Sequence, residues 1–109
     1  MSDEPIKRPF SNPAKLLEIY RFMKEFEEIH ECKPADIELV DAGFASSTSV
    51  IRYYYDRLEE MKMIRRPKLV NKKTGREFTP SRSNILLPLK QAHHIIRDLI
   101  QQEKENAEL

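Results

Sequence analysis

A short link between two helix-forming segments limits the folds that this chain can adopt. Residues 35–42 are predicted to form a short helix, because their apolar residues suit burial on one side and their first turn is acidic. Gly43 follows at the position where a helix commonly ends on a left-handed residue. Phe44 and Ala45 complete the link, and the two serines at 46–47 can cap a second helix. The two helices are therefore separated by only about four residues, one of which is a glycine.

The second of these helices is predicted from about Thr48 to Met61. Its apolar face is defined by residues spaced at i, i+3, i+4, i+7 and i+10, namely Ile51, Tyr54, Tyr55, Leu58 and Met61. The opposite face carries Ser49, Arg52, Tyr53 and Asp56. The two tyrosines of the apolar face are therefore expected in the core. Of the three consecutive tyrosines, only Tyr53 is a candidate for contact with a ligand.

Two further helices and a leading arm are predicted around this pair. Residues 1–10 combine charge with two prolines and are expected to form a disordered arm. A helix should run from Pro13 to about His30, with Ser11 or Asn12 as its cap. Pro88 is expected to open a last helix, and residues 101–109 should fray. The apolar stripe of this last helix consists of Leu89, Ala92, Ile95, Ile96, Leu99 and Ile100.

The pattern between these helices changes at residue 65. Two short segments at 66–70 and 76–79 flank a turn at 71–75 that contains asparagine and glycine, which is typical of a hairpin. Pro67 and Pro80 confine these segments to edge strands. Residues 85–87 can return as a further strand.

Charge is divided unevenly along the chain. The 109 residues have a net charge of only +1. Residues 49–90, however, hold eleven Lys/Arg and four Asp/Glu, a net of +7, and the remaining residues have a net of −6. A basic region between acidic flanks suits a phosphate-binding face. The alternative is a solvated charged surface without a ligand.

The order helix, short helix, tight turn, helix, basic hairpin and helix is typical of a winged helix-turn-helix. The chain resembles the DNA-binding domain of LexA-type repressors and MarR-like regulators over about residues 13–87. The matching residues are Gly43–Val50, Asp56–Glu60 and Ile64–Arg66. Two features depart from the family pattern. Lys62 stands where the family usually has glycine, so that turn should be either strained or differently shaped. The hairpin, about residues 65–83, is longer than a minimal wing.

The autoproteolytic half of a LexA-like repressor has no counterpart in these 109 residues. That activity is therefore not carried over.

The resemblance implies a fold class that is mainly α with a small β-hairpin: a winged helix-turn-helix domain at 11–87 and an additional C-terminal helix at 88–109. The recognition helix, about 47–61, would enter the major groove. Arg52 would contact guanine, while Arg57 would reach the DNA backbone or pair with an acid on its own helix. The basic hairpin would contact phosphates or the minor groove. The candidate DNA-binding residues are Ser46, Ser47, Thr48, Ser49, Arg52, Tyr53, Arg57, Lys72, Lys73, Arg76 and Arg82.

Helix capping is an alternative role for Ser46–Ser49, and a solvated arginine is the alternative for Arg52.

The expected function is sequence-specific binding of double-stranded DNA by a small cytoplasmic transcriptional regulator, such as a repressor. The wide stripe of the last helix predicts a homodimer, although that stripe could instead complete the core. A different class of function is a protein interaction module or an accessory subunit of a replication or partition assembly, with an unidentified protein partner. No catalytic motif, cofactor site or membrane span is predicted. His30, Cys32, His93 and His94 lack zinc-site spacing, so no metal is expected.

Overall fold

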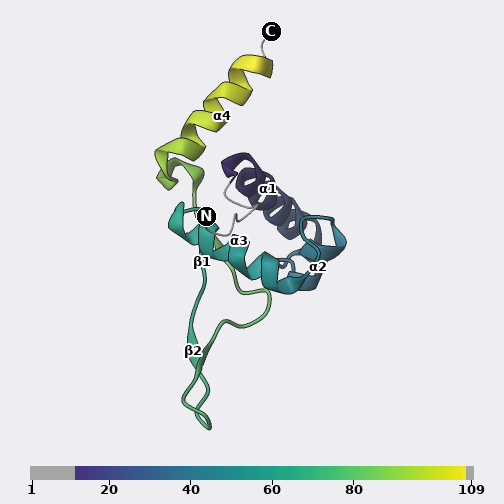
Figure 1. Cartoon of the computed structure of the whole chain (residues 1–109), viewed down its shortest axis with the longest axis vertical. Coiled ribbons are helices and arrows are strands. Elements are labelled where there is room, and N and C mark those ends of the chain that lie inside the picture. Colours follow the sequence, from purple (N-terminus) through teal and green to yellow (C-terminus); the bar gives the residue numbers. More distant parts are fainter. Residues whose placement is uncertain (1–11, 108–109) are drawn as a thin grey trace, which may run out of the picture.

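The computed structural model of the protein describes residues 12–107, so the predicted arm at 1–10 lies outside the described part. The fold is mainly helical, with two small antiparallel strand pairs (Figure 1). This agrees with the expected mainly α class with a hairpin. In chain order the elements are α1 (Pro13–His30), α2 (Asp36–Asp41), α3 (Thr48–Glu60), β1 (Ile64–Arg65), β2 (Leu69–Val70), β3 (Glu77–Phe78), β4 (Ile85–Leu86), the 3₁₀ helix η1 (Leu89–Gln91) and α4 (His94–Ala107).

Helix α1 begins and ends as its sequence predicts. The Asn12 side chain accepts a hydrogen bond from the Ala14 amide at 2.9 Å, and Pro13 takes the first helical position. The helix ends at Glu31, whose backbone is left-handed. Because α1 contacts both α3 and α4, its apolar stripe supplies much of the core.

The tight link between α2 and α3 also follows the prediction. Gly43 has φ +93°, and the Phe44 amide donates to the Leu39 carbonyl at 3.1 Å. The Ser47 hydroxyl accepts from the Val50 amide at 3.4 Å and caps α3. The end of α2 and the start of α3 are therefore both capped within a few residues, which fixes the position of one helix relative to the other.

One hydrophobic core lies between α1, α2, α3, β1 and the start of α4. Tyr54 and Tyr55 are each 3% exposed, which confirms their predicted place in the core. Tyr20 of α1 donates its hydroxyl to the Leu87 carbonyl at 2.7 Å and so joins the helices to the end of β4. The core consists of Leu16, Leu17, Ile19, Tyr20, Met23, Leu39, Ile51, Tyr54, Tyr55, Leu58, Met61, Met63, Ile64, Ala92 and Ile96.

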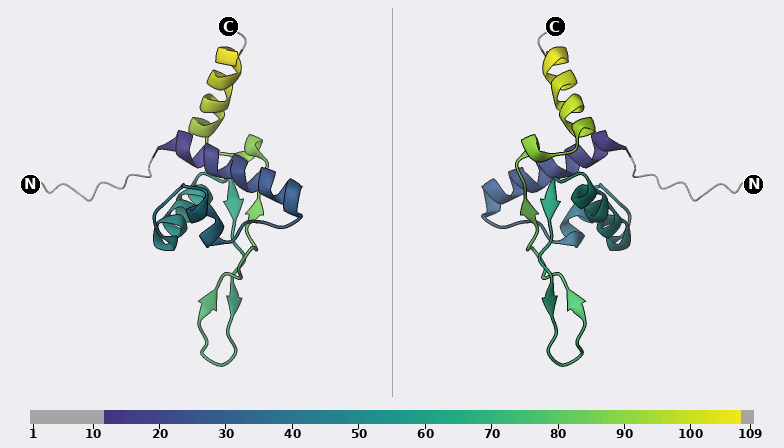
Figure 2. Two further views of the ribbon diagram at one scale, coloured as in Figure 1. Left: turned by 90° about the vertical axis from the view of Figure 1, so that its right-hand side faces the viewer. Right: turned by 90° about the vertical axis from the view of Figure 1, so that its left-hand side faces the viewer.

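The hairpin is built from two separate strand pairs. β1 pairs with β4 next to the core, and β2 pairs with β3 further out. Pro67 and Pro80 lie between the two pairs and have no amide to donate. We call residues 69–78 the distal hairpin. Residues 12–65 and 84–107 form the body. The distal hairpin projects away from the body, on the side opposite to α4 (Figure 2).

The last helix differs from the prediction at both ends. Pro88 is followed by η1, and Ala92 is extended, so α4 begins only at His94. The His93 amide donates to the Met61 carbonyl at 2.8 Å, which ties this break to the end of α3. The predicted fraying from residue 101 is wrong as far as Ala107, because α4 continues to that residue.

Candidate nucleic-acid interface

The N-terminal end of α3 presents hydroxyl groups at the surface. Ser46, Ser47 and Ser49 are exposed, and Thr48 is half-buried. The Ser47 hydroxyl is already used as the cap, so the capping alternative holds for this residue. The remaining hydroxyls lie at the positive end of a 13-residue helix, where anions are favoured.

Arg52 lies one turn further along and is the most exposed arginine of α3. Its side chain is 70% exposed, and its Nε lies 3.3 Å from the Asp36 carboxylate of α2. Such an exposed ion pair contributes little, so a ligand can replace it at small cost. Tyr53 beside it is half-buried.

The C-terminal half of α3 is less suited to an anionic ligand. Arg57 pairs with Glu60 on the same helix, which is the second of the two roles predicted for it. Its side chain is 27% exposed, while the side chains of Glu60 and Asp56 are 60% and 57% exposed. Any nucleic-acid contact of α3 is therefore concentrated in its first two turns.

The turn of the distal hairpin is rigidly built and basic. The Asn71 side chain accepts from the amides of Lys73 and Thr74 at 2.8 and 3.2 Å. Gly75 has φ +75°, and its amide donates to the Asn71 carbonyl at 2.7 Å. Lys72, Lys73 and Arg76 are all exposed, and within residues 12–107 none of these three forms an ion pair.

Arg82 does not belong to this basic turn, although the sequence groups it with Lys72, Lys73 and Arg76. It turns back onto α2, where both terminal nitrogens bind the Glu38 carboxylate at 2.8 and 3.1 Å. One of these nitrogens also donates to the Lys33 carbonyl at 3.2 Å. The hydrogen bond from Arg82, followed by that from the Ala35 amide, holds the pKa of Glu38 below its usual value.

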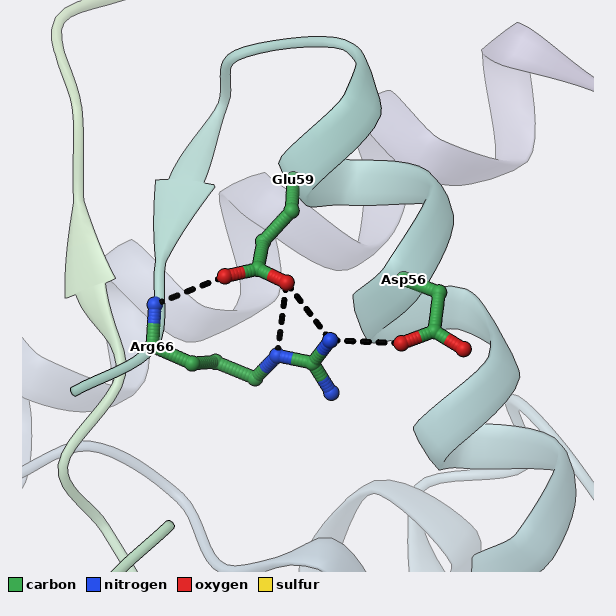
Figure 3. A network of polar contacts seen from close by, with 3 residues as sticks. All are labelled: Asp56, Glu59 and Arg66. Atoms are coloured by element: carbon green, nitrogen blue, oxygen red, sulfur yellow. Dashed lines mark hydrogen bonds and ion pairs between the residues drawn. The ribbon is translucent and has the colours of Figure 1, made fainter. Parts of the chain in front are cut away.

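Arg66 is a residue of this region to which sequence analysis assigned no role (Figure 3). Its amide and its Nε each donate to the Glu59 carboxylate at 3.0 Å, and its NH2 group also binds Asp56. Burial opposes the charge of Glu59, yet the hydrogen bonds from Arg66 outweigh it and lower the pKa of that carboxyl. No sequence signal identifies this contact, because it depends on how β1 returns along α3.

A groove of about 770 Å³ lies between the α2–α3 pair and the hairpin. This size falls within the range of ligand sites in proteins. Its charged lining is mostly basic, with Arg52, Arg66, Lys68 and Arg82 against two acids, Asp36 and Glu77. Ile37 and Phe78, which are about half exposed, add apolar surface. Arg52, Arg66 and Arg82 are each ion-paired within the chain, so Lys68 is the one of these four cations that forms no ion pair within residues 12–107.

The predicted dimer stripe is used mainly inside the chain itself. Ala92 and Ile96 are 3% and 0% exposed and belong to the core, so these two residues are not available to a partner. Leu89, Leu99 and Ile100 pack partly against the same core. Ile95, at 39% exposed, is the one member of the stripe that is open to solvent.

Within residues 12–107, no group of three or more metal-binding side chains is present, and no helix is long and apolar enough to cross a membrane. No family model, curated protein or solved structure matches the chain.

Proposed function

We propose that this chain is a winged helix-turn-helix protein that binds double-stranded DNA with sequence specificity, α3 being the recognition helix and the hairpin the wing. The observation that carries the proposal is the pairing of two surfaces along one groove. Thr48 and Arg52 of α3 line one side of the groove, and Lys68 and Phe78 of the hairpin line the other. The exposed cations Lys72, Lys73 and Arg76 lie beyond the groove on the turn of the same hairpin. Both surfaces suit a polyanion that spans the groove.

Arg52 is the residue that we assign to base reading. Its exposure lets it reach beyond the helix surface, and its weak pair with Asp36 can exchange for guanine O6 and N7. The serines and threonine at the start of α3 would hold neighbouring phosphates and set the register. Tyr53 follows Arg52 on α3 and lies beside these DNA-binding candidates.

The distal hairpin supplies affinity that does not depend on sequence. Lys72, Lys73 and Arg76 lie on a turn whose backbone is fixed by its own hydrogen bonds. Little backbone conformational entropy is therefore lost when they bind phosphates. Each phosphate neutralised by such a cation releases counterions, which makes binding steeply dependent on salt.

As a regulator, the protein would act by occupying a promoter, as a repressor does. We also propose that it acts as a homodimer. α4 projects from the body on the side opposite to the distal hairpin (Figure 2), so a second copy could join there without covering the DNA-binding face. A twofold dimer would place two α3 helices about 34–36 Å apart, one DNA turn, and would require a palindromic site.

One observation favours the second class of function, a protein interaction module. Leu69, Val70 and Phe78 of the distal hairpin are 50%, 57% and 46% exposed. Apolar side chains exposed together on a strand pair suit a protein partner. In that case Arg52 would meet a protein, and affinity would not depend on the hairpin cations.

Fluorescence anisotropy with duplexes selected from a randomised pool tests the proposal. We expect tight binding, and the logarithm of the binding constant should fall linearly with the logarithm of the salt concentration. Arg52→Ala should lower affinity for the selected duplex by about 1–3 kcal/mol, and should change binding to a scrambled duplex much less.

Lys24→Ala is the control, because Lys24 is an exposed cation of α1 that does not line the groove and does not belong to the proposed dimer helix. No binding of the wild type to any duplex at low salt would overturn the proposal and favour the interaction module. If Arg52→Ala lowers the affinity for the selected and the scrambled duplex equally, Arg52 does not read bases.

A further inference from the structure

The base of the hairpin is held to the body by one arginine on each of its two strands. On the returning strand, Arg82 places its guanidinium on Glu38, with a further hydrogen bond to the Lys33 carbonyl. Its Nη1 also lies 3.8 Å from the Cys32 sulfur. These partners precede Arg82 by 44 to 50 residues, so the contacts tie the hairpin to α2 and to the segment after α1.

The backbone around Arg82 is shaped to make this contact. Arg82 has φ +61°, a left-handed conformation that a side chain other than glycine rarely adopts. The Ser83 hydroxyl donates to the Pro80 carbonyl at 2.6 Å and closes the turn. A strained residue of this kind persists where its surroundings hold it, and here the Glu38 carboxylate binds it with both oxygens.

Arg66 does the same on the outgoing strand, but toward a different helix. Its side chain is 14% exposed and binds Glu59 and Asp56 of α3 (Figure 3). Its guanidinium also lies 5.9 Å from the centre of the Tyr55 ring. The hairpin is therefore anchored to α3 on one strand and to α2 on the other.

Backbone pairing alone does not fix the direction of the distal hairpin. The ladder is interrupted between β1–β4 and β2–β3, and Pro67 and Pro80 stand in the interruption. Two strand pairs joined by unpaired segments can bend relative to one another. The side-chain anchors lie within this interruption, where they can restrict the bend.

We infer that Arg66 and Arg82 are positioning residues that set the angle of the distal hairpin to α3. Their effect on DNA binding rests on the proposed function. The angle would determine how far the phosphate-contacting cations of the distal hairpin lie from Arg52, which reads the bases. Arg82 thus acts through Glu38 and not as a phosphate contact, since its guanidinium is already engaged by the chain's own acceptors.

Glu38→Gln separates these two roles, because it leaves the charge of Arg82 in place. The glutamine can still accept the hydrogen bond from the Ala35 amide, which Glu38 accepts at 2.7 Å, so the start of α2 is retained. A phosphate-contacting Arg82 would bind DNA equally well or better after this change. A positioning Arg82 would lose the charged partner and the acceptor of its second terminal nitrogen, so its anchor would weaken.

The orientation of the distal hairpin is measured first, without DNA, by amide residual dipolar couplings of the weakly aligned full chain. In the wild type, residues 69–78 and helices α1–α3 should fit one alignment tensor. In Glu38→Gln and in Arg82→Gln, the couplings of residues 69–78 should shrink, while those of the helices stay unchanged. The effect of Arg82→Gln should be at least as large, because Arg82 also bonds the Lys33 carbonyl, and the double variant should equal Arg82→Gln. Unchanged couplings in both single variants would overturn the inference.

Duplex binding then tests the consequence for recognition. Both single variants should weaken binding to the selected duplex, by about fivefold to tenfold for Arg82→Gln and by no more than that for Glu38→Gln. A loss in Arg82→Gln alone would overturn the positioning role and make Arg82 a direct contact. Glu60→Gln is the control, since it removes the partner of Arg57 and does not touch the hairpin. Failure of the wild type to bind DNA would defeat the proposed function only, because the couplings still measure the anchors.

Discussion

The body and the distal hairpin use apolar residues in opposite ways. In the body, the residues that recur at helical spacing are buried, and Ile51 and Leu58 are fully so. In the distal hairpin, Leu69, Val70 and Phe78 stay about half exposed. The body is therefore stabilised by burial, whereas the distal hairpin takes its shape from a turn and from anchors at its base. The difference shows that one chain can combine a packed scaffold with an arm whose apolar residues stay exposed.

The charges divide in the same way. The arginines of α3 and of the hairpin base form ion pairs within the chain, namely Arg52, Arg57, Arg66 and Arg82. The cations of the turn at 71–76 have no such partners among the described residues. The pairs of Arg66 and Arg82 link the base of the hairpin to α3 and α2, whereas the cations of the turn form no ion pair within residues 12–107.

The largest expected effect tests the difference in burial. Leu58→Ala should lower the free energy of unfolding by about 2–5 kcal/mol, because it opens a cavity in the core. Phe78→Ala should change it by no more than about 0.5 kcal/mol, because the ring is largely exposed. Urea denaturation followed by circular dichroism measures both. A loss above about 2 kcal/mol for Phe78→Ala would show that the distal hairpin is part of the core.

The second effect concerns the free charges of the hairpin. Replacing Lys72, Lys73 and Arg76 with alanine should weaken binding to every duplex and reduce the salt slope by up to about 2.7, roughly 0.9 for each lost phosphate contact. The free energy of unfolding should stay within about 0.5 kcal/mol of the wild type, because all three side chains are exposed.

The matched control for this triple variant replaces Lys24, Arg97 and Lys104, which are exposed cations of α1 and α4. It removes the same net charge from the opposite part of the molecule. An equal reduction of the salt slope in the control would mean that overall charge, and not the hairpin, attracts DNA.

How much the sequence predicts differs between the same two regions. The body was predicted closely, since periodicity, caps and a glycine act within a few residues of one another. Asn12, Gly43 and Ser47 each have the local role expected of them. The start of the last helix was predicted wrongly. Pro88 is a good first residue for a helix, but burial of Ala92 and the bond from His93 to Met61 require a break before α4.

The candidate site was only partly accessible to sequence analysis. Exposure of Arg52, Lys72, Lys73 and Arg76 agrees with what their positions suggested. The contacts of Arg82 join residues 44 or more positions apart, and no short pattern encodes them. Charge alone places Arg82 with the other cations of the hairpin, whereas the fold gives it a carboxylate partner on α2.

A third prediction uses pH to separate the two regions. The pKa of Glu38 is lowered by Arg82, so the anchor it forms is complete above the usual glutamate pKa and is lost as pH falls through the lowered value. Burial raises the pKa of Tyr20, Tyr54 and Tyr55, so folding favours their neutral forms and stability falls once pH exceeds about 10.

Acid should therefore loosen the hairpin, and base should destabilise the body. Amide spectra recorded from pH 6 to pH 3 should show signals of residues 69–78 changing before those of α1 and α3. Urea denaturation between pH 8 and pH 11 should show a falling free energy of unfolding. Simultaneous change of both regions in acid would mean that the hairpin does not move independently.

The smallest effect concerns two left-handed residues that differ in what holds them. Lys62 has φ +63° at the end of α3, and the Met63 amide donates to the Leu58 carbonyl across it at 2.9 Å. The Lys62 side chain is exposed and makes no hydrogen bond or ion pair within residues 12–107. Lys62→Gly should therefore relieve backbone strain and raise the free energy of unfolding by up to about 1 kcal/mol.

Arg82→Gly is the comparison, because it relieves the same strain but removes the anchor to Glu38. Arg82→Gly should not raise the stability measured by thermal denaturation, and the dipolar couplings of its residues 69–78 should shrink. An equal gain in both variants would mean that the Arg82 anchor contributes nothing to the folded state. A loss in Lys62→Gly would mean that the greater freedom of glycine in the unfolded chain outweighs the strain relieved at the end of α3.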